Sequence, residues 1–378
     1  MAPSDLERST PLWVIFLRAL AALVVTFMFL TSVSIMGTGF KMAGSGAVDG
    51  LLKTASNPFV GLFCGILVTS VLQSSSATTS MLVALVSTGD LPIRLAIPVV
   101  MGANIGTTVT NTIVAMGHVT RPREFRRAIS CSTMHDFFNM LCVLILLPFE
   151  LLTHFLERSA GFMAQLFAGI GSEITHTSPV KMLIKPIVNA VSELCQRFPG
   201  YGAPIAMEIV GGLLLFASLY CLTRVLKSLM LGRIESMLGG YLDRHGPVGI
   251  LVGAGATAAV QSSSVTTSFF VPLAAAGVLK PRQIYPMVLG ANLGTTITAL
   301  LASLAGSVAG LTLAFTHLLF NLLGLLIFYP VPEMRWPIWI ADKFGRFAVR
   351  RRVMAVVYVI VAFYLIPLLL MFLTRLGS

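Results

Sequence analysis

Two polar stretches of the chain, residues 73–80 and 261–268, have the residue types of an ion-binding site. They read QSSSATTS and QSSSVTTS and are identical at seven of eight positions. Serine and threonine hydroxyls donate hydrogen bonds to anion oxygens and offer lone pairs to a cation. The glutamine carbonyl is a neutral oxygen ligand of the kind that small hard cations accept. These stretches therefore predict a site for an oxyanion, a small cation, or both.

A second pair of stretches repeats at the same spacing. GANIGTT (102–108) and GANLGTT (290–296) are identical at six of seven positions, and they are as far apart along the chain as the first pair. Their glycines are typical of close helix packing or of hinges, whereas Asn104 and Asn292 carry amides that need hydrogen-bond partners. Repetition of both stretches indicates a chain built from two similar halves whose polar parts meet in one site.

The composition restricts the class of protein. Of 378 residues, 56% are hydrophobic and only 11% are charged, whereas soluble domains carry about 25% charged residues. The 26 Lys and Arg outnumber the 15 Asp and Glu, but they form short clusters between apolar runs, which is typical of cytoplasmic loops. They are not gathered with interleaved aromatic residues, which argues against binding of nucleic acid. We therefore expect an all-α polytopic membrane protein.

Two kinds of apolar segment can be distinguished. Uninterrupted ones, each long enough to span a bilayer, cover residues 12–36, 125–152, 203–227, 307–330 and 353–373. Interrupted ones, broken near the middle by glycine, asparagine or hydroxyl residues and further by prolines, cover 58–88, 91–117, 246–277 and 281–305. Irregular backbone at membrane depth is tolerated only inside protein or beside a wet cavity. The interrupted segments therefore predict re-entrant hairpins or discontinuous helices.

The basic clusters predict that the two repeats have inverted topology. Four arginines lie in the loop 121–127 of the first repeat, but its counterpart in the second repeat, 304–308, has no charge. Conversely, three basic residues follow the first helix of the second repeat, in 224–233, whereas little charge follows the first helix of the first repeat. Since basic loops stay cytoplasmic, equivalent loops would lie on opposite sides of the membrane.

Interfacial helices are expected at 44–56 and 232–244. The resulting division is a cytoplasmic N-terminal tail (1–11), a first repeat (12–157), an extracytoplasmic linker (158–199), a second repeat (200–330), a basic cytoplasmic segment (331–352) and a final helix with its tail (353–378).

The broken segments also predict how an anion would be held. Where the chain re-enters a helix, the unpaired N–H groups and the positive helix end favour negative charge. Two inverted copies would direct two such ends at one point. Because the donors are neutral, an oxyanion would bind best when cations supply the missing charge.

Asp136 is the one acidic residue deep within the segment 125–152. It could be an ion ligand, as intramembrane carboxylates are by default, or it could pair with a nearby histidine or arginine. Asn139 lies one turn further on the same side. His135 and His317 are expected to be hydrogen-bonded structural residues rather than proton relays.

At these residues the chain resembles type II sodium–phosphate cotransporters, whose hallmark is a QSSS motif in each of two inverted repeats. MGANIGTTVTNTIVAMG (101–117), EFRRA (124–128) and HDFFN (135–139) also resemble that family. The resemblance implies sodium-driven uptake of inorganic phosphate by alternating access, with sodium as the coupling ion and no cofactor.

The resemblance also implies a site that lies between the two QSSS motifs. The expected phosphate-binding residues are Gln73, Ser74, Ser75, Ser76, Asn104, Thr107, Gln261, Ser262, Ser263, Ser264, Asn292 and Thr295. The expected sodium ligands are Gln73, Ser76, Thr79, Thr112, Asp136, Asn139, Gln261, Ser264, Thr267, Thr295, Thr296 and Asn321.

Family members with an aspartate at the position of Asp136 tend to be electrogenic, so the resemblance implies an extra sodium ion in each cycle. The chain departs from vertebrate members at His118 and Arg121, where those members have a glutamine and an aspartate linked to sodium binding, and at Ala291, where some have serine. Its size resembles a bacterial member, for which an inner-membrane location with a cytoplasmic N-terminus is expected.

Three other functions could use the same residues. The same scaffold could carry arsenate, sulfate or a small carboxylate in place of phosphate. An intramembrane serine hydrolase is disfavoured, because the chain has no Gly-x-Ser-x-Gly turn and no lysine in the hydroxyl-bearing segments to act as a base. A membrane scaffold or receptor fits poorly with so much polar, broken helix at membrane depth. We therefore expect a transporter rather than an enzyme.

Overall fold

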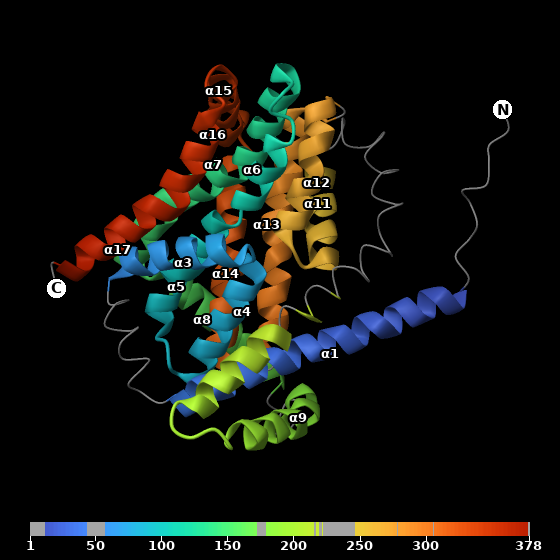
Figure 1. Cartoon of the computed structure of the whole chain (residues 1–378), viewed down its shortest axis with the longest axis vertical. Coiled ribbons are helices and arrows are strands. Elements are labelled where there is room, and N and C mark those ends of the chain that lie inside the picture. Colours follow the sequence, from blue (N-terminus) through green and yellow to red (C-terminus); the bar gives the residue numbers. More distant parts are fainter. Residues whose placement is uncertain are drawn as a thin grey trace.

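The structure, a computed structural model, consists of helices and turns, with no strand among the residues it describes (Figure 1). The described residues are 12–43, 57–171, 179–214, 217–218, 221, 246–277, 279–304 and 306–376. The prediction of an all-α protein is confirmed. The interfacial helices expected at 44–56 and 232–244 lie outside the described residues, as does most of the second half of the segment 203–227.

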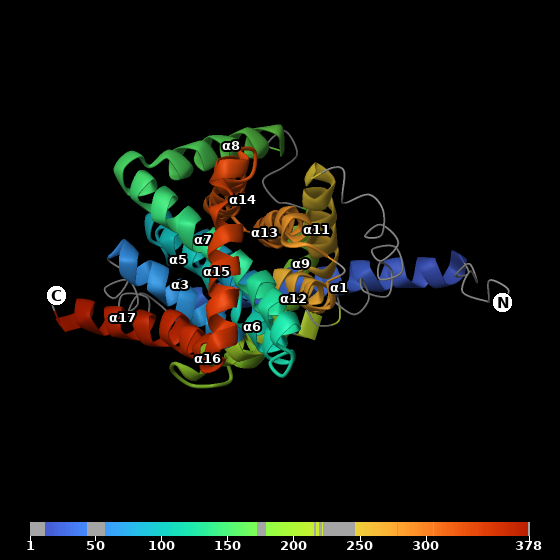
Figure 2. The same ribbon diagram turned by 90° about the horizontal axis from the view of Figure 1, so that it is seen from above.

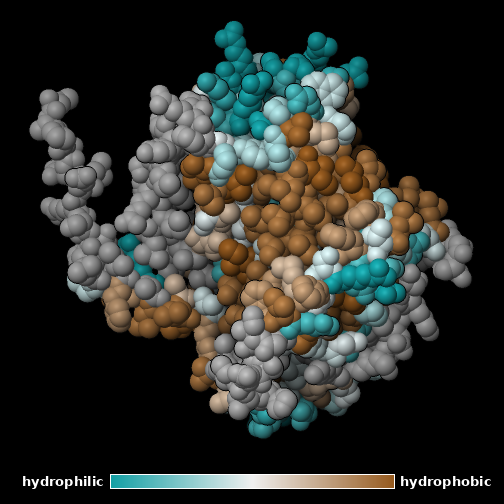
Figure 3. Space-filling model, turned by 180° about the vertical axis from the view of Figure 1, so that it is seen from behind, coloured by the Kyte–Doolittle hydropathy of each residue, from teal (hydrophilic) through white to brown (hydrophobic). Residues whose placement is uncertain are grey.

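Several helices have the length and composition of membrane spans. Within the described part of the chain these are Ile93–Met116, Pro122–Thr153, Pro281–Ser303, Val308–Phe328 and Val353–Thr374. On the face drawn in Figure 3, a broad apolar surface lies below a strongly hydrophilic end. The predicted spans 125–152, 307–330 and 353–373 are thus confirmed as apolar helices, and the predicted span 12–36 lies within helix α1 (Leu12–Ala43).

Two helical hairpins contain the QSSS motifs. In the first, α3 (Pro58–Leu72) ends just before the motif and α4 (Ser75–Thr88) begins inside it. In the second, α11 (Gly246–Val260) and α12 (Ser263–Ala276) are separated at the equivalent residues. The predicted interruptions of 58–88 and 246–277 are confirmed, and each occurs at the glutamine and first serine of its motif.

The GAN motifs differ between the two halves. In the first half, α5 (Ile93–Gly106) and α6 (Val109–Met116) are separated at Thr107 and Thr108, which confirms the expected break in 91–117. In the second half, α13 (Pro281–Ser303) is one continuous helix, so the break predicted in 281–305 is wrong.

The two halves differ locally at the second threonine of the motif. Thr295 and its counterpart Thr107 both donate to a carbonyl of their own helix, at 3.0 Å. Thr296 also donates within its helix, at 2.6 Å, a bond that threonine makes without ending a helix, whereas its counterpart Thr108 contacts His135. Pro281 occupies the first helical position, where its missing N–H removes no hydrogen bond. Pro98 and Pro286 also lie inside helices and end neither of them.

Glycines bring α3 against α5, and α11 against α13, at backbone distance. A Cβ atom on Gly102 would lie 2.0 Å from the carbonyl oxygen of Leu62, and one on Gly290 would lie 2.0 Å from that of Ile250. Any larger residue would push the helices apart. The two halves therefore use the same close contact, at equivalent positions of the repeat.

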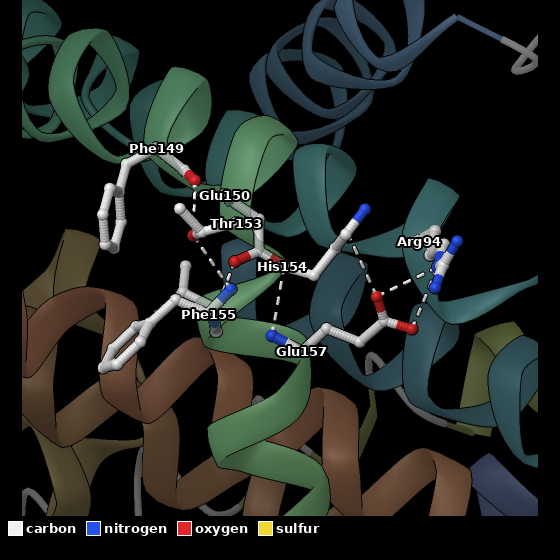
Figure 4. Close-up of polar contacts among 8 residues, drawn as sticks. Arg94, Phe149, Glu150, Thr153, His154, Phe155 and Glu157 are labelled. Carbon is white, nitrogen blue, oxygen red and sulfur yellow. Dashed lines mark hydrogen bonds and ion pairs between the residues drawn. The ribbon is translucent and has the colours of Figure 1, made fainter.

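A sharp corner joins α7 (Pro122–Thr153) to α8 (Phe155–Gly171). His154 adopts a left-handed conformation (φ 53°) between them. The Glu150 carboxylate accepts hydrogen bonds from the backbone N–H groups of residues 156 and 157, at 2.6 and 3.1 Å, and so caps α8 (Figure 4). Glu157 is paired with Arg94 of α5 at 3.0 Å. The corner thus fixes α8 to the bundle.

The segment expected as a polar linker, 158–199, contains helical structure that its composition did not suggest. It includes most of α8 and all of α9 (Pro179–Cys195). Ala160 and Ala164 of α8 pack against Phe315 of α14 (Val308–Phe328). Part of the linker is therefore joined to the membrane-spanning bundle.

The C-terminal part of the chain packs against helices of the first half, namely α7 and α3. A short 3₁₀ helix (Pro332–Met334) leads to α15 (Trp336–Arg350), which packs against α7. After three arginines, α16 (Val353–Ile360), a π-helical turn (Val361–Leu365) and α17 (Ile366–Leu376) form one apolar rod. This rod runs beside α3 (Figure 2).

Candidate functional site

The two QSSS motifs have the same backbone conformation. Gln73 (φ 54°) and Gln261 (φ 52°) are both left-handed, which ends the preceding helix and turns the chain. Ser74 and Ser262 are extended and cap the following helices, because their hydroxyl oxygens accept hydrogen bonds from the backbone N–H three residues on, at 3.2 and 3.3 Å. Each motif thus presents a helix N-terminus inside the protein.

The two motifs meet in space. The Ser76 hydroxyl of the first donates to the backbone carbonyl of Gln261 in the second, at 3.0 Å. Ser264, which is equivalent to Ser76, donates to the backbone carbonyl of Thr107 at 3.3 Å. The N-termini of α4 and α12 therefore lie beside backbone carbonyls that the helix breaks leave free, at Gln261 and at Thr107.

The middle serines have free hydroxyls. Ser75 and Ser263 are each 3% exposed, and neither hydroxyl makes a hydrogen bond with any described residue. They occupy the first positions of α4 and α12, where backbone N–H groups have no partner within the helix. The motifs contain no charged side chain, so the site offers an anion only neutral donors.

A crossed pair of asparagine contacts joins the two halves. The Asn104 amide donates to the Asn321 carbonyl oxygen at 3.2 Å, and the Asn292 amide donates to that of Asn139 at 2.8 Å. Asn104 is equivalent to Asn292 and Asn139 to Asn321, so each GAN asparagine contacts the closing helix of the other half. These buried amides hold the halves together directly.

The two histidines belong to this network. His317 Nε2 lies 2.9 Å from Asn104 Oδ1, and His135 Nδ1 lies 2.9 Å from the Thr108 hydroxyl. Both rings are buried. His317 Nδ1 has no hydrogen-bond partner among the described residues, and the structural role expected for the histidines stays a prediction.

Asp136 is fully buried. One carboxylate oxygen accepts a hydrogen bond from the Tyr358 hydroxyl at 3.2 Å, and the other has no hydrogen-bond partner in the described part of the chain. No described arginine or histidine forms an ion pair with it, and the choice between an ion ligand and a structural carboxylate stays a prediction. An open carboxylate oxygen in a buried position is suited to a cation.

Comparison of the sequence with known proteins identifies its family. The model of the Na+/Pi-cotransporter family matches residues 28–173 and 213–336. The chain belongs to this family.

Relatives in the family are similar over most of the chain. Sodium-dependent phosphate transport protein 2B of Bos taurus is 35% identical over 94% of this chain and 64% of its own length. The 2B protein of Homo sapiens is 32% identical over 93% and 64%, and the 2A protein of Rattus norvegicus is 33% identical over 90% and 65%. This Na+/Pi-cotransporter family member thus spans slightly less than two thirds of the length of these relatives. No solved structure matches the chain.

Some of the expected ligands of this family member lie in the site but use their hydroxyl hydrogens elsewhere. Thr79 and Thr267 donate to the backbone carbonyls of Ser75 and Ser263, at 2.9 and 2.6 Å. Thr295 and Thr296 bond within α13, as described above, and no hydrogen bond in the described structure connects them to the QSSS motifs. Thr112 is buried, and its hydroxyl oxygen has no hydrogen-bond partner among the described residues.

Two polar residues at the site were not expected from the sequence. Asn111 bridges the halves, because it donates to the Thr267 hydroxyl at 2.8 Å and accepts from the Ser268 hydroxyl at 2.7 Å. The Thr110 hydroxyl donates to the Gln73 side-chain oxygen at 2.5 Å. The rule that singled out Asn104, an amide in a broken segment, could also have found Asn111.

His118 and Arg121 lie away from the QSSS motifs. Both contact Glu124 at the start of α7, at 3.2 and 3.0 Å. In this family member the two positions therefore form a partly exposed charged cluster.

Proposed function

We propose that this protein is a sodium-coupled symporter that imports inorganic phosphate by alternating access. Its relatives are named sodium-dependent phosphate transport proteins. The observation that carries the proposal is the contact between the two QSSS motifs, with Ser76 bonded to the Gln261 carbonyl at 3.0 Å. One anion could then reach both helix N-termini.

Phosphate would bind through neutral donors. The hydroxyls of Ser75 and Ser263 and the free N–H groups at the starts of α4 and α12 would bond its oxygens. The other residues expected to bind phosphate include Gln73, Gln261, Thr107 and Asn292. They would contact the anion directly or hold the residues that do. Because no arginine or lysine is present in either motif, a divalent anion needs bound cations to offset its charge.

Sodium would supply that charge. Buried oxygens without a hydrogen-bond partner among the described residues include Asp136 Oδ1, Gln261 Oε1 and the Thr112 hydroxyl, and oxygen ligands of this kind suit a hard cation. A cycle that moves one net positive charge inward would gain about 2.3 kcal/mol per 100 mV. Asp136, as a buried carboxylate, would bind the ion that makes the cycle electrogenic.

The two halves would form inverted repeats around the site. The crossed contacts of Asn104 with Asn321 and of Asn292 with Asn139 are those expected when a two-fold axis relates the halves. With the basic clusters at 121–127 and 335–352 in the cytoplasm, the N-terminus would be cytoplasmic, in the plasma membrane of a bacterial cell.

Hydrolysis is the alternative from another class. A serine nucleophile needs a base within hydrogen-bond reach. Ser75 and Ser263 have no histidine, lysine or carboxylate partner among the described residues. We therefore propose transport without a chemical step.

Binding of phosphate to the purified protein tests the proposal. In isothermal titration calorimetry, phosphate should bind at least about tenfold more tightly in sodium than in choline, because sodium offsets its charge. Competition with sulfate and arsenate would identify the preferred anion. Sodium-independent binding of phosphate, or preference for sulfate, would contradict the proposal.

A further inference from the structure

An apolar groove lies on the outer surface of the molecule, and no residue of either QSSS motif lines it. Its volume is about 610 Å³, and its walls come from α3, α5, α7, α15 and the C-terminal rod. The lining includes Phe63, Leu144, Phe347, Met354, Val361 and Ile366.

The groove lies at the depth of the hydrocarbon. Two of its walls are the spans Pro122–Thr153 and Val353–Thr374. Leu144 is 70% exposed and Ile366 is 42% exposed, so the groove opens onto the surface that faces lipid tails. At this depth the occupant of an apolar groove is a hydrocarbon chain, because water would gain no hydrogen bonds there.

One end of the groove is strongly basic. Arg350, Arg351 and Arg352 connect α15 to α16 between two residues of the lining, Phe347 and Met354. All three are exposed, and none forms an ion pair within the described residues. The one carboxylate of α15, Asp342, is already bonded to Arg126 and Arg346.

We propose that the groove is a binding site for an anionic phospholipid. One acyl chain lies in the groove, and the phosphate lies against the arginines 350–352. Arginine suits this role because its planar guanidinium bonds phosphate oxygens in a bidentate manner. A zwitterionic lipid offers the same chain but no net charge, so the arginines select the anionic head group.

Native mass spectrometry of the purified full chain tests the site, with phosphatidylglycerol and phosphatidylcholine of identical acyl chains as probes. The wild type should retain phosphatidylglycerol about tenfold more strongly. The variant R350Q/R351Q/R352Q should lose that preference. A control with the same loss of charge, R123Q/R197Q/R282Q, should keep it, because those exposed arginines lie outside the groove.

The groove itself is tested by filling it. Leu144→Trp should reduce retention of both lipids. Leu152→Trp, on the same helix at a residue that is 84% exposed and outside the lining, should leave both unchanged. Three results would overturn the proposal. The wild type could retain the two lipids equally, or R350Q/R351Q/R352Q and Leu144→Trp could both leave lipid retention unchanged. The third is a dimer of the protein in which a second copy, rather than lipid, covers the groove.

Discussion

The proposed phosphate site depends on two serines whose hydroxyls are not used by their neighbours. In each QSSS motif the first serine caps a helix and the third donates to a carbonyl at a helix break, Gln261 or Thr107. Of the three serines in each motif, only the middle one, Ser75 or Ser263, has a hydroxyl without a partner among the described residues. The motif therefore separates residues that build the turn from the residue that we propose contacts phosphate.

Replacing a middle serine tests this division. Ser75→Ala or Ser263→Ala should raise the phosphate concentration for half-maximal uptake by about tenfold or more, since a hydrogen bond to a charged group contributes about 1.5–3 kcal/mol. The sodium concentration for half-maximal uptake should rise as well, because the two ions bind cooperatively.

A matched control is Ser132→Ala. Ser132 is buried and its hydroxyl bonds to a carbonyl of its own helix, at 3.0 Å, so uptake should be unchanged. Unaltered uptake kinetics in both Ser75→Ala and Ser263→Ala would contradict the role assigned to these residues.

At the scale of elements, glycine contacts hold the hairpins that present the motifs. Gly102→Ala would place a methyl group 2.0 Å from the Leu62 carbonyl oxygen. We expect a loss of about 1–3 kcal/mol in stability, visible as a lower melting temperature of the purified protein. Gly212→Ala, where no atom lies within 4 Å of the added Cβ, should leave the melting temperature equal or higher. The opposite order would contradict the packing argument.

The C-terminal rod has a second role at this scale. Tyr358 donates to Asp136 at 3.2 Å, and Tyr364 donates to the Ser70 carbonyl at 3.0 Å, one turn before the first QSSS motif. An element near the end of the chain thus contacts both the carboxylate and the end of α3.

Tyr358→Phe tests whether this contact positions Asp136. The ring packs on Phe344, with centroids 4.8 Å apart, and phenylalanine keeps that packing. We expect the sodium concentration for half-maximal uptake to rise about tenfold, since a hydrogen bond to a charged group is lost. The phosphate dependence at saturating sodium should not change. An exposed control, Tyr201→Phe, should behave as wild type, and so should Tyr358→Phe if its hydroxyl has no such role.

The internal repeat predicted some features of the fold and misled at others. The internal repeat pointed to both QSSS breaks, which the structure has at Gln73 and Gln261. It also suggested a break in α13 by analogy with α5 and α6. There the analogy failed, because threonine hydroxyls and a proline at the helix start are compatible with a continuous helix. Tyr358 could not be found in this way, since its helix has no repeated partner and its contact with Asp136 joins distant parts of the chain.

At the scale of the molecule, two similar halves enclose the site but are not identical. In the first half, a short turn at Thr107 and Thr108 interrupts the helix, and the Thr107 carbonyl accepts a hydrogen bond from Ser264 of the second half. The second half has continuous helix at the equivalent place. The alternating access proposed above requires one half to move against the other around the site, and this difference between the halves marks where their backbones depart from symmetry.

Uptake of radiolabelled phosphate into proteoliposomes tests the central claim, sodium-coupled symport, most directly. We predict uptake that requires an inward sodium gradient and that accelerates at an inside-negative potential, which contributes about 2.3 kcal/mol per charge per 100 mV. Uptake indifferent to the potential would contradict the electrogenic role of Asp136. Folded protein that shows no sodium-dependent phosphate uptake would contradict the account as a whole.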